Sequence, residues 1–381
     1  MWSLAAYFLR LGATGFGGPV ALVGYMERDL VHDRKVVTAD EFSAGLAFSQ
    51  MAPGPLAAQL AIYIGWLRGG VVGASTIGLA FIGPSFIMVV ALAAAYVRYG
   101  GLAWMQGAFT GIAAAVIAVM ARSVVRLARS TLRQHPVLWA TAVANAVVVA
   151  VMRSEIIWVI VLSGLIVPAL ARMRIRTGAV AATAVPVWLT ALAGSVGTPV
   201  AQTAAPTLAS LVGYFAKAGS VVFGSGLAIV PYLHGGVVEA HHWTTERQFL
   251  DAVAVSMITP GPIVIMVAFV GYLVAGLSGA GAAAVGVFLP VYLSVVVLAP
   301  VFTQLLTRPA VRQFVAGVTA AATGAIAGAV FVMADRALVD GFTLGVAIVA
   351  AGAPLVMRKL PDPLLVVAGG LVGALRGLSA I

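Results

Sequence analysis

Two stretches of this chain repeat each other in register, 207 positions apart, as Phe215 lies from Phe8. Both copies carry a phenylalanine, a basic residue, a Phe-Gly turn, a tyrosine and a Pro-Gly-Pro, namely Phe8, Arg10, Phe16-Gly17, Tyr25 and Pro53-Gly54-Pro55, then Phe215, Lys217, Phe223-Gly224, Tyr232 and Pro260-Gly261-Pro262. Apolar chains match themselves by chance at Ala, Val and Leu, but not readily at these residue types. The pattern predicts a duplicated unit whose breaker-rich core is the working site.

The composition restricts this unit to a membrane. The chain is 62% hydrophobic and 9% charged, with a mean hydropathy of +1.07, so it has too few charged residues to cover a soluble surface. Uncharged runs of about 20 residues recur along its length, which is typical of a polytopic α-helical membrane protein. Because the chain has no cysteine, disulfides and thiolate chemistry are excluded.

The hydrophobic segments divide the chain into two halves. We expect an N-terminal repeat at 1–176, a linking helix and loop at 177–207, and a C-terminal repeat at 208–381. The segments are 2–26, 42–67, 71–97, 102–121, 136–152 and 156–171 in the first half, and 208–233, 249–277, 279–302, 313–334, 341–357 and 363–377 in the second. The predicted fold is therefore all-α, with about six helices in each repeat and breaks in the first two.

This count of thirteen segments predicts an inverted repeat, because six spans plus one linking span is odd. Loop Lys and Arg residues number 13 in even loops and 6 in odd loops, which favours a cytoplasmic N-terminus and an external C-terminus. The same rule explains the net charge of +10 by cytoplasmic loops rather than by nucleic-acid binding. A broken segment that enters and returns on one side would lower the count.

The Gly-Phe-Gly-Gly-Pro turn at 15–19 predicts the junction of two half-helices. Glycine permits unusual backbone angles, and proline is favoured at the first turn of a helix. The new N-terminus would present unpaired N–H groups and about half a positive charge, which suits an anion. In the second copy, Ser225 adds a hydroxyl. The alternative is a glycine-rich helix crossing.

Arg10 and Lys217 occupy equivalent positions shortly before these turns. A cation within a span costs roughly 2.5–3.5 kcal/mol on insertion scales, so it normally faces a partner or a watery cavity. The partner would be the transported anion or an acid from another helix. The alternative is that both side chains extend to the membrane interface.

The two Pro-Gly-Pro motifs break the second segment of each half. Uncharged hydrogen-bonding residues precede them and would suit an oxyanion; they are Ser49, Gln50, Ser256 and Thr259. The alternative is a kink that serves packing alone.

The remaining polar residues predict no catalytic or metal centre. His234, His241 and His242 lie with Glu239 in a loop of uneven spacing, which favours a surface loop over a metal site. Asp251 is the most embedded acid and a weak candidate for proton coupling. Since no acid pair, Ser-His-Asp set or phosphate-binding loop is evident, we expect neither an enzyme nor a cofactor.

These motifs resemble those of the chromate ion transporter family, in its long-chain two-domain form. The first half matches from Phe8 through Phe16–Pro19, Glu27-Arg28 and Phe42–Pro55, and the second at Phe223–Pro231 and Pro260–Pro262. The resemblance implies chromate export across the bacterial inner membrane and chromate resistance, with sulfate as a competitor. One departure concerns the first loop, where Val36 stands in place of a tryptophan that Trp243 retains in the second.

The resulting hypothesis is a secondary carrier for a tetrahedral oxyanion. Its expected substrate site comprises Arg10, Phe16, Gly17, Gly18, Pro19, Ser49, Gln50, Pro53, Gly54, Pro55, Lys217, Phe223, Gly224, Ser225, Gly226, Ser256, Thr259, Pro260, Gly261 and Pro262. The alternatives are an importer of sulfate or another oxyanion, and an anion channel. The oligomeric state, a homodimer included, stays open, as does the coupling ion.

Overall fold

The computed structural model describes residues 1–16, 18–99, 103–132, 135–152, 162–163, 165–166, 207–221, 223–224, 226, 229–305, 309–357, 360 and 362–379. The expected linking helix and most of the segment expected at 156–171 lie outside these residues. Five helices in the described part are long and apolar enough to cross a membrane, and two shorter apolar helices accompany them. The predicted class, an all-α polytopic membrane protein, is confirmed.

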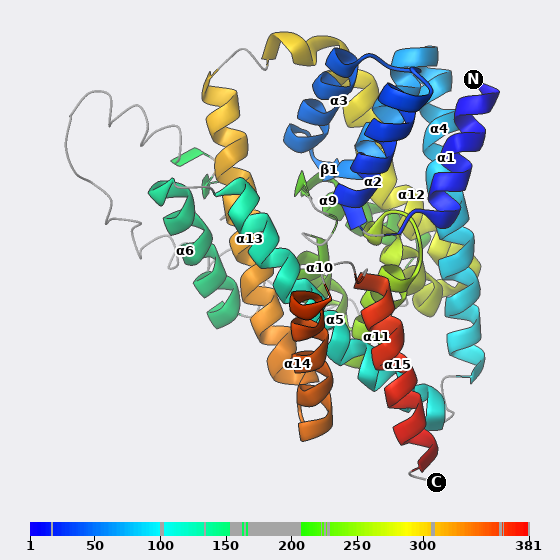
Figure 1. The fold of residues 1–381 in the computed structure, drawn as a ribbon, viewed down its shortest axis with the longest axis vertical. Helices are drawn as coiled ribbons and strands as arrows, with labels where there is room; N and C mark the ends of the chain where they lie inside the picture. Colours follow the sequence, from blue (N-terminus) through cyan, green and yellow to red (C-terminus); the bar gives the residue numbers. More distant parts are fainter. Residues whose placement is uncertain are drawn as a thin grey trace.

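The elements of the first half run from Trp2 to Met152 (Figure 1). They are α1 (Trp2–Thr14), α2 (Gly18–Glu27), the π-helix η1 (Arg28–Asp33), α3 (Ala39–Met51), β1 (Gly54–Pro55), α4 (Leu56–Tyr99), α5 (Ala103–Thr131) and α6 (Pro136–Met152). Those of the second half are α9 (Leu208–Val221), β2 (Phe223–Gly224), α10 (Ile229–Leu233), the π-helix η3 (His234–Ala240), α11 (Glu246–Ile258), the 3-10 helix η4 (Ile263–Ile265), α12 (Met266–Leu305), α13 (Pro309–Ala337), α14 (Gly341–Val356) and α15 (Asp362–Ser379).

The first hydrophobic segment of each half folds back on itself as a helical hairpin. In the first half, the Tyr7 hydroxyl on α1 donates a hydrogen bond to the Tyr25 carbonyl on α2, at 3.3 Å. In the second half, Tyr214 on α9 donates to the Tyr232 carbonyl on α10 at 3.2 Å. The sequence left open whether this segment crosses or returns, and in the structure it returns.

The second hydrophobic segment is also a hairpin, formed by α3 and the first limb of α4. The rings of Phe48 and Tyr63 stack at 5.7 Å near its tip, and Glu41 pairs with Arg68 at its base. Since two expected spans of the first half are hairpins, thirteen crossing segments is too high a number. The loops must therefore be sorted anew, and the orientation of the termini stays a prediction.

Sharp bends divide α4 and α12 at equivalent places. Gly70 and Gly276 adopt φ of 57° and 60°, a left-handed conformation that glycine tolerates without steric cost. Each bend joins a short limb of the hairpin to a long limb, at 71–99 in α4 and 277–305 in α12. In Figure 1 the cyan C-terminal end of α4 lies at the bottom, whereas the gold C-terminal end of α12 lies at the top.

Capping chemistry is duplicated as well. Thr38 and Thr245 cap α3 and α11 through reciprocal capping boxes, with Glu41 and Gln248 as the third helical residues. Each box satisfies two backbone N–H groups that the helix itself leaves unpaired. The same local sequence signal thus starts the second hairpin in both halves.

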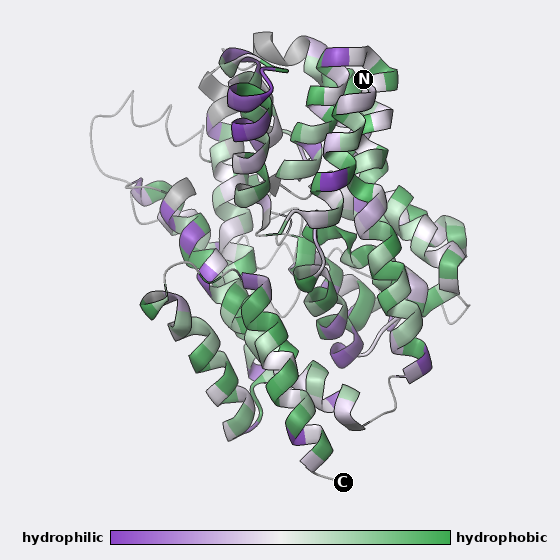
Figure 2. Ribbon diagram, turned by 45° about the vertical axis from the view of Figure 1, so that its right-hand side comes forward, coloured by the Kyte–Doolittle hydropathy of each residue, from purple (hydrophilic) through white to green (hydrophobic). Residues whose placement is uncertain are grey.

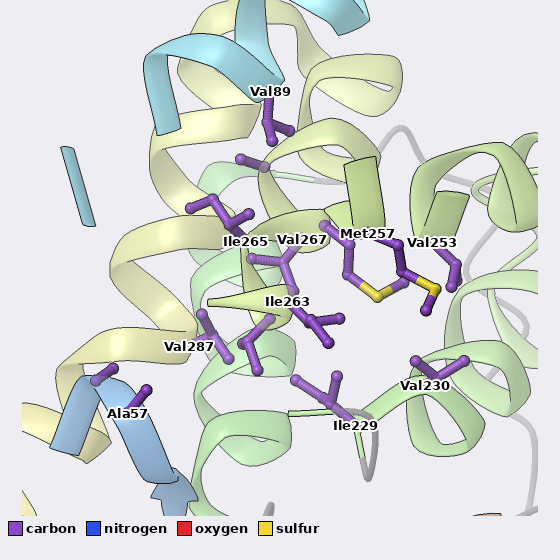
Figure 3. Packing of buried hydrophobic residues seen from close by; sticks show 14 of the residues in the cluster. Ala57, Val89, Ile229, Val230, Val253, Met257, Ile263, Ile265, Val267 and Val287 are labelled. Atoms are coloured by element: carbon purple, nitrogen blue, oxygen red, sulfur yellow. The ribbon is translucent and has the colours of Figure 1, made fainter. Parts of the chain in front are cut away.

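Apolar residues form both the exposed surface and the buried core of this protein. Apolar residues make up most of the ribbon in Figure 2. Large apolar side chains such as Trp2 (90%) and Val72 (75%) are exposed, as a lipid-facing surface requires. Inside, the hairpins of both halves share one core. Figure 3 shows Ala57 and Val89 of the first half in the same cluster as Ile263 and Val287 of the second.

Close helix crossings hold the hairpins against the long limbs. A Cβ at Gly12 would collide with the backbone oxygen of Phe81, and one at Gly219 with that of Val287. Gly24, by contrast, has open space around it. Gly12 and Gly219 therefore set how closely α1 and α9 approach their partners.

We predict that Gly12→Ala destabilises the protein by about 1–3 kcal/mol, the usual cost of overpacking. Gly24→Ala serves as the matched control and should be neutral or stabilising by up to about 1 kcal/mol, because alanine favours a helix. Thermal unfolding of both variants in detergent measures the difference. Equal midpoints for the two variants would contradict the close crossing.

Candidate functional site

The hairpin tips of the two halves are hydrogen-bonded to each other. β1 pairs in parallel with β2, with Gly54 opposite Phe223 and Pro55 opposite Gly224. In the reciprocal contact, the N–H of Gly261 donates to the carbonyl of Gly15 at 3.1 Å. Each Pro-Gly-Pro motif is thus bonded to the Phe-Gly turn of the opposite half, an arrangement we call the crossed tips.

The residue types at the crossed tips explain their backbone. Gly54 and Gly261 adopt φ of 141° and 98°, where other residues would be strained. The flanking prolines lack N–H groups and favour the start of a helix. α4 begins at Leu56 directly after the first motif, and η4 begins at Ile263 after the second.

Helix N-termini therefore gather at the crossed tips. Besides α4 and η4, α2 begins at Gly18 directly after the first Phe-Gly turn. The first four N–H groups of a helix have no partner within it, and the helix dipole adds partial positive charge there. Such a gathering of donors favours an anion over a cation.

Two buried polar residues that sequence reasoning missed support the tips. The amide nitrogen Nε2 of Gln59 donates to the Pro53 carbonyl at 2.7 Å, and the Ser85 hydroxyl donates to the Gly12 carbonyl at 3.2 Å. Both side chains are fully buried. A signal was present, because Gln59 is the only polar side chain in the run from Leu56 to Ile62.

The hydroxyl residues predicted for the site bond to their own helices. Ser49 donates to the Gly45 carbonyl at 2.8 Å, Ser256 to the Val253 carbonyl at 2.6 Å, and Thr259 to the Val255 carbonyl at 3.0 Å. Their donor capacity is therefore used within the hairpins in this conformation. Gln50 is exposed, and Phe16 is 41% exposed.

Arg10 lies on the exposed side of α1, together with small residues. Ser3, Ala6, Ala13 and Thr14 are all exposed on that helix, as is Arg10 itself. They lie three, four or seven positions from Arg10 and so share its face. Large apolar residues at those positions would indicate lipid, whereas small and polar ones favour a watery surface.

Lys217 lies in the same setting on α9, where Gly213 and Ser220 are also exposed. In the polar turn at the base of the hairpin, partial burial and then the nearby Lys217 ammonium lower the pKa of His241. Within the described residues, Arg10 and Lys217 take part in no ion pair.

The structure thus brings together part of the predicted site. The two Pro-Gly-Pro motifs, Gly15 and the Phe223-Gly224 strand meet directly. Gly17 and Ser225 lie outside the described residues.

The interpretation of His234 as part of a surface loop is wrong. His234 begins the π-helix η3, is 4% exposed, and its Nε2 lies 2.8 Å from the Glu246 carboxylate. Burial follows from the π-turn, which directs the ring against Phe249 at 5.4 Å. Among the residues that the structure describes, no group of three His, Cys, Asp or Glu side chains could hold a metal.

Comparison with known proteins agrees with the duplicated architecture. The profile of the family described as "Chromate transporter" matches twice, at residues 2–167 and 209–374. The chain belongs to this family. It is therefore a membrane transporter rather than an enzyme, and the suspected family resemblance is confirmed.

Full-length relatives share close to half of their residues with this chain. A "Chromate transport protein" of Cupriavidus metallidurans is 48% identical over 97% of this chain and 92% of its own length. A "Probable chromate transport protein" of Synechococcus elongatus is 46% identical over 98% of this chain and 94% of its own. A "Chromate transport protein" of Pseudomonas aeruginosa is 33% identical over 76% and 70%. No solved structure matches the chain.

Because the chain has no cysteine, introduced pairs can test the crossed tips directly. Paired strands lie about 4.8 Å apart, within the range of about 4.4–6.8 Å between Cα atoms that a disulfide spans. We predict that Pro55→Cys combined with Gly224→Cys forms a disulfide on mild oxidation. A maleimide mass tag should then label neither thiol.

The control pair is Gly24→Cys with Gly281→Cys, two positions with open surroundings. Both of these thiols should remain available to the tag after the same oxidation. Full labelling of the Pro55→Cys and Gly224→Cys pair in folded protein would contradict the observed register.

Proposed function

We propose that this protein is a secondary carrier that exports chromate from the bacterial cytoplasm and thereby confers chromate resistance. Its membership of the family and the names of its relatives support chromate as the substrate. The observation that carries the mechanism is the crossed tips, where backbone segments of both halves are hydrogen-bonded. Irregular backbone within a membrane protein is tolerated where it is buried in protein or lines a cavity.

The chemistry of the crossed tips suits a tetrahedral oxyanion. Backbone N–H groups at the starts of α2, α4 and η4 can donate to its oxygens, and the helix dipoles favour its charge. Half-helix N-termini directed at an anion between two repeats are a recurring device of transporters. Hydroxyls such as Ser256, which now bond within their helix, would become donors to the substrate only on rotation.

The crossing also provides a route to alternating access. Since each tip is bonded to the opposite half, a rotation of one half against the other must remake the contacts at both motifs. The geometry of a substrate site built from these contacts would then differ between the inward-open and the outward-open states of the carrier. This mechanism requires the halves to be inverted repeats, as the opposite directions of the long limbs of α4 and α12 support (Figure 1).

In this proposal Arg10 and Lys217 attract the dianion along the exposed small-residue faces of α1 and α9. A cation without an acidic partner retains its full field for a substrate. Both residues can act without permanent contact with the crossed tips, because they need only raise the local anion concentration. Their equivalent positions would serve the two opposite openings of the carrier.

The hairpin bases support a cytoplasmic N-terminus. In the first half they carry Arg28, Arg34, Lys35 and Arg68, whereas the corresponding stretch of the second half carries only Arg247. Basic residues are enriched on the cytoplasmic side. We infer that the N-terminus lies inside and the C-terminus outside. A membrane potential that is negative inside would favour dianion export by about 2.3 kcal/mol per charge per 100 mV.

We predict that Arg10→Gln and Lys217→Gln each weaken the apparent affinity for chromate by about tenfold, because charges that line a cleft raise the local concentration of an oppositely charged substrate by about 10- to 1,000-fold. Uptake of labelled chromate into everted membrane vesicles measures the effect. Arg98→Gln is the matched control, since Arg98 is an exposed arginine over the Tyr99 ring and is not among the predicted site residues.

Two further measurements in the same vesicles separate the rivals. Competition by sulfate tests whether another tetrahedral dianion is the better substrate, because backbone donors discriminate poorly between the two. Flux that neither saturates nor exchanges with unlabelled chromate would indicate a channel. Unchanged affinity in both Arg10→Gln and Lys217→Gln would remove these residues from the substrate path.

A further inference from the structure

A buried carboxyl group joins the two halves away from the crossed tips. Asp251 lies on α11 of the second half and is 1% exposed. Its Oδ2 accepts a hydrogen bond of 2.9 Å from the hydroxyl of Tyr96, on α4 of the first half. The Tyr96 ring packs against Phe109 at 5.0 Å and Phe269 at 5.3 Å, so the contact is enclosed by aromatic side chains.

No cation in the described residues forms an ion pair with this carboxyl. The Arg247 guanidinium acts on it electrostatically. This side chain is exposed, and its Nη2 donates a hydrogen bond to the Gln106 carbonyl at 2.9 Å. Two arginines on other elements packed against α11 have acidic partners, Arg122 of α5 with Asp362 and Arg376 of α15 with Asp340. The His234 ring of η3 lies against Glu246. η4 carries no titratable group. In the part of the chain that the structure describes, Tyr272 of α12 and Arg98 of α4 form no hydrogen bond or ion pair with this carboxyl.

A carboxylate buried without a cation is costly in its charged form. A proton on the group removes that cost, while the Tyr96 hydroxyl stabilises the charged form by donating to it. Burial without a cation therefore favours the protonated form of Asp251, whereas the hydrogen bond from Tyr96 favours the charged form. Such a group can bind and release a proton without a change of partner.

The fold itself does not require this pair. The positions equivalent to Asp251 and Tyr96 in the opposite halves are Ala44 and Phe302, both apolar. Of the two equivalent positions in the duplicated fold, one therefore has the polar pair and the other has two apolar residues. A contact that served packing alone would more readily be apolar in both copies, because hydrophobic replacements of buried polar pairs are often neutral or stabilising.

We propose that Asp251 is the proton-binding site that couples inward proton movement to outward oxyanion transport. When charged, the carboxylate accepts a strong, charge-assisted hydrogen bond from Tyr96 and ties α11 to α4. When protonated, it holds this contact less strongly, which biases the two halves toward the other arrangement. The proton binds at a carboxylate oxygen from the outer side and leaves to the cytoplasm. This inference rests on the proposed function, whose driving ion it names.

Purified full-length protein in liposomes tests the inference, with the membrane potential held at zero by potassium and valinomycin. A pH difference of about one unit, coupled through one proton, supports a roughly tenfold chromate ratio toward the acidic side. The wild type should reach this ratio. In Asp251→Asn the chromate concentrations on the two sides should become equal, while chromate exchange without a gradient should fall by less than threefold.

Two variants complete the design. Asp33→Asn removes an exposed acid and should leave the accumulation ratio within twofold of the wild type. Tyr96→Phe keeps the carboxyl but removes its donor, so the proton should bind more tightly and the pH of half-maximal transport should rise. This second variant decides the matter if Asp251→Asn fails to fold.

The outcomes separate the two proposals. Absence of chromate exchange in the wild type would overturn the proposed function itself. Normal exchange together with gradient-driven accumulation in Asp251→Asn would overturn only the coupling role of Asp251. An unchanged pH profile in folded Tyr96→Phe would also overturn it.

Discussion

The backbone contacts between Pro-Gly-Pro motifs and opposite Phe-Gly turns are the interaction on which the remaining arrangement depends. Backbone amides in a membrane interior need partners, since neither lipid nor bulk water supplies them. A hairpin that ends halfway through a protein leaves such groups at its tip. Here the tip of one half meets the tip of the other, through β1 with β2 and through Gly261 with Gly15. Neither half could satisfy these groups in the same way alone.

This interdependence explains why breaker residues are duplicated rather than merely tolerated. Gly54 and Gly261 provide the backbone angles of the turn, and the adjacent prolines avoid unsatisfied N–H groups where the next helix begins. Gln59 and Ser85 then occupy carbonyls near the tips without adding charge. The result is a region rich in helix N-termini, whose described tip residues include no acidic side chain, and it is therefore suited to a negatively charged ligand.

Charge is used sparingly and unequally between the halves. Each copy has a basic residue at the equivalent position, Arg10 or Lys217, as expected for residues that serve two equivalent openings. Asp251 with Tyr96, and His234 with Glu246, occur in only one copy. A carrier needs symmetry in the path of its substrate, but the source of its driving force can be asymmetric. The apolar equivalents of the Asp251 pair agree with this division.

The sequence by itself determined the membrane class, the duplication and the residues of the turns, because composition, register and breaker residues are local properties. It also contained the capping signals at Thr38 and Thr245. Only the tertiary structure decided that the first two segments return as hairpins, since an apolar run has the same composition whether it crosses or turns back. The partners of Ser85 and Asp251 were likewise beyond prediction, as they lie 73 and 155 positions away in the chain. Such contacts depend on how the two halves pack together, and no periodicity within either half encodes that packing.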